Sequence, residues 1–89
     1  MPTLSMFYGL LVSMYFMDTN EHNSPHIHVR YQDFKAVFGI PDGNLLAGQL
    51  PPKKRKLIEA WIEIHHEELM ADWSLAIEGK ELFRIDPLK

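Results

Sequence analysis

One stretch decides how this chain folds: residues 25–31, with the sequence Pro-His-Ile-His-Val-Arg-Tyr. Residues two apart on a β-strand point to the same face of a sheet. The alternation therefore predicts a strand that carries His26, His28 and Arg30 in a cationic row on one face. The opposite face would carry an apolar row, made of Ile27, Val29 and Tyr31.

Three further apolar segments surround this strand and predict its neighbours. Leu10–Met17 precedes it, and Phe34–Ile40 and Asn44–Leu50 follow it. Only Gln32-Asp33 separates the strand from the next segment, which indicates a hairpin. Pro41-Asp42-Gly43 is a strong turn signal, because Pro presets φ and Gly tolerates the left-handed conformation. Strands joined at such short spacing predict an antiparallel meander.

After Leu50 the apolar period changes from that of a strand to that of a helix. Apolar residues follow at spacings of three and four from Leu57 onward, and the pattern stops at Gly79. Pro52 suits the first turn of such a helix. A helix over residues 52–78 would be about 40 Å long, longer than so small a domain, so we expect a bend or break around residues 66–72. Residues 82–85 predict a short final strand.

The fold class expected is therefore α+β, a curled antiparallel meander with the helix packed on one face. The apolar row of the 26–31 strand would face the helix, and the cationic row would face away from it. The 89 residues of the chain are few enough that we expect a single domain, residues 1–89.

Composition narrows the chemistry and the location. The chain has no cysteine, so a metal site must use His and carboxylates, which suits zinc, nickel, iron or manganese. Absence of cysteine also fits the reducing cytoplasm. The apolar run Met6–Met17 is shorter than the roughly 20 residues of a membrane-spanning helix. No basic residue precedes it, as one would in a signal peptide, so we expect a soluble cytoplasmic protein.

The histidines supply the candidate site. His26 and His28 on one strand face would have Cα atoms about 6.6 Å apart, close enough for both rings to reach one metal ion. His22, or else Asp18, would then supply a third ligand. Without a metal, His26 and His28 suit acid–base catalysis or ligand binding near neutral pH, with Arg30 beside them. The remaining alternative is that these histidines only shape the loop and a wet sheet face.

The second pair of histidines is a weaker signal. His66-Glu67-Glu68-Leu69-Met70 begins like the zinc-protease motif H-E-x-x-H, but Met70 stands where the second histidine belongs. The metalloprotease interpretation therefore fails. His65 belongs to the apolar stripe of the helix, and we expect it in the core or at its boundary.

The charge is unevenly distributed. The net charge of −3 does not suggest a nucleic-acid binder, yet Lys53, Lys54, Arg55 and Lys56 are consecutive, and residues 59–72 contain five acids and no Lys or Arg. The helix macrodipole disfavours cations at a helix start, so stability does not explain the basic run. It is a candidate patch for a polyanion or an acidic partner; a solvated first turn is the alternative.

Several ordered motifs together resemble one protein family. They span nearly the whole chain: Met1-Pro2-Thr3-Leu4-Ser5-x-Phe7-x-Gly9, Met14-Tyr15-Phe16, His22-x-x-Pro25-His26-x-His28-Val29, Asp42-Gly43-x-Leu45-x-x-Gly48-x-Leu50-Pro51, Ala60-Trp61-Ile62-x-Ile64-His65-x-x-Glu68-Leu69, Trp73 and Ile85-x-Pro87-Leu88. The chain resembles the small bacterial and archaeal proteins known as domain of unknown function 4160. Many members have a second Pro where this chain has Ser24.

The resemblance implies a partner. Members are often encoded beside a second small family, in an arrangement similar to toxin–antitoxin gene pairs. By that analogy, we expect a protein-interaction module that pairs with a small cognate protein, using the His26, His28 and Arg30 face. Two alternatives stay open: a small His-dependent hydrolase or nuclease, with or without a divalent metal ion, and a structural homo-oligomer such as a dimer. No cofactor other than such an ion is expected. The sequence does not decide whether the protein is an enzyme.

Overall fold

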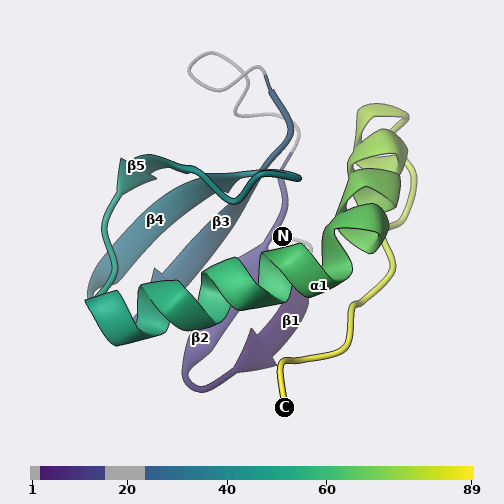
Figure 1. The fold of residues 1–89 in the computed structure, drawn as a ribbon. Coiled ribbons are helices and arrows are strands. Elements are labelled where there is room, and N and C mark those ends of the chain that lie inside the picture. The colour runs from purple at the N-terminus through teal and green to yellow at the C-terminus, as the bar shows by residue number, and fades with distance from the viewer. Residues whose placement is uncertain (1–2, 16–23) are drawn as a thin grey trace.

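The computed structural model describes residues 3–15 and 24–89, and within them the fold is α+β. Five strands form one open antiparallel sheet in chain order, followed by one long helix (Figure 1). The strands are β1 (Thr3–Phe7), β2 (Leu10–Ser13), β3 (His26–Tyr31), β4 (Phe34–Gly39) and β5 (Leu45–Gly48), and the helix is α1 (Pro52–Ile77). The predicted meander and its following helix are confirmed.

The strand register fixes which side chains share a face. On β3, His28 lies opposite Ser13 of β2 and Val37 of β4. Arg30 lies opposite Leu11 of β2 and Lys35 of β4 in the same way. Because directly paired residues of an antiparallel sheet point to the same side, one sheet face carries these residues as two adjacent rows.

The other sheet face forms the core with α1. Ile27 and Val29 of β3 are buried there, as the apolar row predicted. The remaining members of the core come from β1, β2, β4, the residues that follow β2, β4 and β5, the helix and the C-terminal tail: Leu4, Phe7, Leu10, Val12, Met14, Ala36, Phe38, Ile40, Leu50, Ile58, Trp61, Ile62, Leu69, Trp73 and Ile85. Burial of these side chains is the main contribution to the stability of so small a domain.

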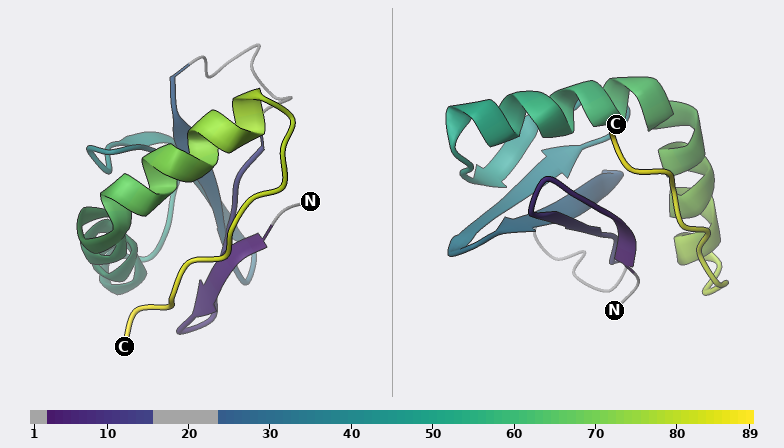
Figure 2. Two further views of the ribbon diagram at one scale, coloured as in Figure 1. Left: turned by 90° about the vertical axis from the view of Figure 1, so that its right-hand side faces the viewer. Right: turned by 90° about the horizontal axis from the view of Figure 1, so that it is seen from below.

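The helix is broken at His65, whose φ of −111° and ψ of 20° are not helical. The proximal half, residues 52–64, crosses one face of the sheet, and the distal half, residues 66–77, turns sharply and passes the end of the sheet (Figures 1 and 2). A straight helix of this length would measure about 39 Å, whereas the longest dimension of the Cα trace is 34 Å. The predicted bend is present, immediately before residues 66–72.

The C-terminal tail, residues 80–89, is tied to three parts of the fold, and Figure 2 shows its path past the distal half of α1 toward β1. The Phe83 amide donates to Asp72 Oδ1 (2.9 Å), and the Ile85 amide donates to the Leu4 carbonyl of β1 (2.9 Å). Trp61 Nε1 of α1 donates to the Asp86 carbonyl (2.8 Å). The predicted strand over residues 82–85 is wrong: the tail bonds alternately to sheet and helix and forms no ladder.

The sheet instead gains its fifth strand at the N-terminus. We predicted the first strand at Leu10–Met17, of which the structure shows Leu10–Ser13 as β2, but β1 was not predicted. Tyr8 and Gly9 form a tight turn in which both residues have positive φ, 49° and 80°. Tyr8 is an uncommon residue for that conformation, so the sequence gives only half of a turn signal. Across residues 3–15 and 24–89, none of the helical structure is long and apolar enough to cross a membrane.

Candidate functional site

The sheet face opposite the helix holds an open trough of about 460 Å³. It runs across β2, β3, β4 and β5, and its floor consists of the paired side chains described above. The residues that line it are Leu11, Ser13, Tyr15, His28, Val29, Arg30, Lys35, Ala36, Val37, Ala47 and Gly48. The trough volume is within the range of small-molecule sites and of pockets for a few side chains of a partner.

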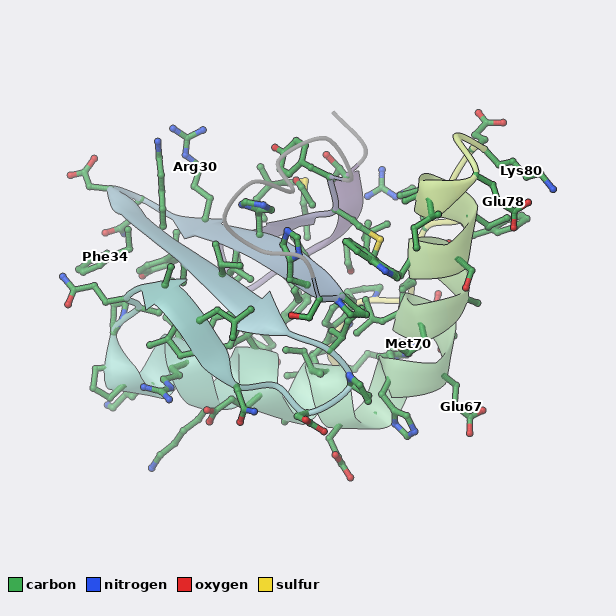
Figure 3. All side chains as sticks on the ribbon, turned by 90° about the horizontal axis from the view of Figure 1, so that it is seen from above. Arg30, Phe34, Glu67, Met70, Glu78 and Lys80 are labelled. Carbon is green, nitrogen blue, oxygen red and sulfur yellow. The ribbon has the colours of Figure 1, made fainter. Side chains whose placement is uncertain are left out.

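Charge gathers at one end of the trough. Arg30 is exposed at this end (Figure 3). It lies directly opposite Lys35 on the neighbouring strand, so two cations are adjacent. Like charges directly opposite each other on a sheet destabilise it. No acidic residue is found among the described residues that line the trough. This end of the trough therefore suits an anionic group of a ligand or partner.

His28 stands at the other end of the lining. It is half-buried, and the edge of its ring meets Tyr15, with ring centroids 4.7 Å apart. Val37 and Ala47 in the row of His28, and Leu11 in the row of Arg30, provide apolar surface beside these polar groups. A partner segment that fits here needs apolar side chains and, at the Arg30 end, a carboxylate or phosphate.

His26 differs from the two other members of its predicted row. Its side chain is fully buried, and Nδ1 lies 2.7 Å from the Ser24 carbonyl. Its ring packs against Trp73, with centroids 5.1 Å apart. The expectation that His26 is exposed beside His28 and Arg30 is wrong, because the distal half of α1 passes the end of the sheet where β3 begins and covers it. His26 does not line the trough.

The predicted metal site lies partly outside the described residues. His22 and Asp18 both fall in the segment 16–23, so their positions relative to the strand are not described. The His26 and His28 rings have centroids 5.3 Å apart. Within residues 3–15 and 24–89, no three His or acidic side chains are grouped so as to hold a metal ion. A metal held by His22, His26 and His28 stays a prediction.

The four residues of the basic run have different environments. Lys54 Nζ donates to the Tyr8 carbonyl (2.9 Å) and lies over the Tyr31 ring, 5.0 Å from its centroid. Arg55 pairs with Glu59 one helical turn later, at 3.1 Å. Lys53 and Lys56 are exposed and form no ion pair within the described part of the chain. In this basic run, Lys54 and Arg55 are therefore bonded to other parts of the protein, whereas Lys53 and Lys56 are exposed to solvent.

The helix histidines have local roles. His65 Nδ1 lies 2.6 Å from Glu68 Oε1, and its ring packs on Trp61 with centroids 5.5 Å apart. His65 is therefore a boundary histidine of the core, as predicted. His66 Nδ1 lies 3.0 Å from the Glu63 carbonyl. Neither residue lines the trough.

Asp72 is a buried carboxylate that sequence patterns did not single out. Burial raises its pKa above the ordinary value of 3.8; the bond from the Phe83 amide opposes this rise, and the charge of Glu68 adds to it. Its Oδ1 accepts the Phe83 amide, while Oδ2 has no hydrogen-bond partner within the described residues. Asp72 joins the distal half of α1 to the tail, so its position indicates a structural role.

Sequence reasoning missed most of the trough lining, Lys35 above all. Lys35 becomes a site residue only because the hairpin places it opposite Arg30. The signal was available, since the two-residue gap Gln32-Asp33 pairs Tyr31 with Phe34 and hence Arg30 with Lys35.

Comparison with known proteins gives a family and no activity. A search of curated proteins and a search of solved structures each found no match to the chain. One family model matches residues 9–74, which span β2 to the distal half of α1 and include the whole trough. That match covers well over half of the chain, and the protein therefore belongs to the family described as Domain of unknown function (DUF4160).

Proposed function

We propose that this protein is a protein-interaction module, whose trough binds an apolar segment bearing a carboxylate on a small cognate protein. One observation carries the proposal: Arg30 and Lys35 lie side by side at the end of an apolar trough, with no acidic residue among its described lining. That placement costs stability, so a binding partner explains it better than folding does. The resemblance to toxin–antitoxin gene arrangements supports a partner encoded by the adjacent gene.

The test is co-purification of the tagged protein with the product of the adjacent gene. We expect a stoichiometric complex, which Arg30→Glu together with Lys35→Glu breaks, because reversed charges repel the partner carboxylate. We expect at least about a tenfold loss of affinity by calorimetry, since charged partners across an interface typically couple by more than 1.4 kcal/mol.

The control is a double variant with the same change in net charge, Lys80→Glu together with Arg84→Glu. Both residues are exposed and lie outside the trough. The control should retain the wild-type affinity. Failure of the adjacent gene product to co-purify, or equal losses in the two double variants, would contradict the proposal.

The hydrolase or nuclease alternative is less well supported by the geometry. It requires His26 and His28 to act on one substrate, with Arg30 holding a phosphate. Only His28 and Arg30 line the trough, while the His26 ring is buried against Trp73. A lone accessible imidazole suits binding better than paired acid–base catalysis. RNA cleavage that is lost in His28→Ala would reverse this preference.

A further inference from the structure

A second surface of the molecule combines aromatic rings with cations, on the helix side of the sheet and apart from the trough. We propose that this turn-end surface binds single-stranded nucleic acid. It comprises Tyr8, Tyr31, Lys53, Lys54 and Lys56, drawn from the β1–β2 turn, the end of β3 and the first turns of α1. The proposal does not depend on the trough or its partner.

Lys54 brings the three elements together. Its Nζ donates to the Tyr8 carbonyl and lies over two rings, 5.0 Å from the centroid of Tyr31 and 5.9 Å from that of Tyr8. Tyr31 in turn contacts Phe34 across the hairpin, with ring centroids 6.5 Å apart and nearly parallel planes. A cation therefore lies next to aromatic rings, and these are the two kinds of group that single-strand binding proteins combine, rings for the bases and cations for the phosphates.

Tyr8 is the ring on which a base can stack. Its side chain is 53 % exposed although it is large and apolar, and it stands at the tip of a tight turn with φ of 49°. A residue of this size is uncommon at positive φ, so the turn itself does not explain its presence. Stacking on an exposed ring is available to every base, which predicts binding with little sequence preference.

Lys53 and Lys56 supply the charge for the phosphates. They are three residues apart on α1, hence on one side of the helix, and both are exposed. A positive charge is unfavourable at a helix start, and α1 has no acidic residue in its first turn to offset it. With Lys54 and Arg55 between them, four of the nine basic residues are consecutive in the first turns of α1, in a chain of net charge −3.

The test is fluorescence anisotropy of the full chain with labelled single strands of about 12 nucleotides, one RNA and one DNA, at low salt. We expect wild type to bind, and Lys53→Glu with Lys56→Glu to weaken binding by at least about tenfold. The double variant should also reduce the slope of log affinity against log salt by about 1.4, because two phosphate contacts are lost.

Tyr8→Asn tests stacking without disturbing the turn, because Asn accepts positive φ and the main-chain acceptor of Lys54 remains. We expect about a tenfold loss of affinity for single strands. A duplex of the same length should bind more weakly than either single strand, since its bases are already stacked. Lys80→Glu with Arg84→Glu is the control of equal charge, and Arg30→Glu with Lys35→Glu should still bind, which separates this surface from the trough.

Stronger binding of the RNA or of the DNA strand shows which of the two the surface prefers, and binding of either one supports the proposal. Three results would overturn it: no binding of either strand by wild type, an equal loss in the equal-charge control, or an unchanged affinity of the Tyr8→Asn variant. The unfolding midpoint of each variant shows whether it is folded under the conditions of the assay.

Discussion

Gly48, at the end of β5, shows how one residue shapes the trough. It lies opposite Ala36 on β4, one residue pair from an irregularity in the β4–β5 register, and its φ is 75°. A Cβ atom there would meet the Lys35 carbonyl oxygen at 2.1 Å. The close approach of the two backbones holds β5 against the strand that carries Lys35, so Gly48, itself part of the trough lining, also helps to position a site residue.

We predict that Gly48→Ala lowers the free energy of unfolding by about 3 kcal/mol or more, because a left-handed alanine costs about 1–2 kcal/mol and the clash adds to it. Gly79→Ala is the matched control: its φ is 72°, but nothing lies within 4 Å of the added Cβ. That variant should lose only the cost of the left-handed conformation, about 1–2 kcal/mol, which is about half of the loss in Gly48→Ala or less. Urea titration followed by tryptophan fluorescence measures both, and equal losses would contradict the close-approach argument.

At the scale of the elements, the apolar periodicity of the sequence predicted the strands and the helix that interactions between nearby residues determine. Alternation predicted β3 and the burial of Ile27 and Val29. Helical spacing predicted α1 over residues 52–78, and the structure shows it over Pro52–Ile77. The β1 strand was missed because its turn contains Tyr8, and the exposed position of His26 was wrong because Trp73 approaches from far along the chain. Cross-strand neighbours such as Lys35 become visible only when the strands are paired.

The C-terminal tail has no regular secondary structure, and only some of its residues contribute to the stability of the fold. Ile85 is 4 % exposed and belongs to the core, whereas the nearby Phe83 is 73 % exposed. We predict that Ile85→Ala lowers the free energy of unfolding by about 2–4 kcal/mol, and that Phe83→Ala changes it by less than about 0.5 kcal/mol. Thermal or urea unfolding of the two variants checks this, and a larger effect of Phe83→Ala would show that the exposed ring has a packing role.

At the scale of the whole molecule, the placement of charge favours binding over stability. Cations gather at the turn end of the sheet and the first turns of α1, whereas acids occupy residues 59–72. Lys35 lies opposite Arg30 on the neighbouring strand, and Lys53 lies in the first turn of α1, at the positive end of the helix dipole. Each arrangement weakens the fold slightly and supplies a positive surface.

At Lys35 we expect a trade-off between the stability of the fold and the binding of the cognate protein. Lys35→Glu should raise the free energy of unfolding by about 0.5 kcal/mol, because it converts a repulsive cross-strand pair into an attractive one. The same variant should weaken binding of the cognate protein. Lys35→Gln removes the repulsion alone and should give a smaller gain in stability. Paired unfolding and calorimetry experiments measure the two effects, and a loss of stability in Lys35→Glu would contradict the assignment of Lys35 to a ligand-facing role.

The break at His65 makes the spacing between two sets of helix residues critical. Trp61 and Ile62 before the break and Leu69 and Trp73 after it are all buried, although the two pairs lie on different halves of the helix and pack on different sides of the core. Each α-helical residue advances the side chains by about 100°. Insertion or removal of a single amino acid between the two sets would rotate Trp73 away from His26, so the length of this connection is constrained as strictly as its chemistry.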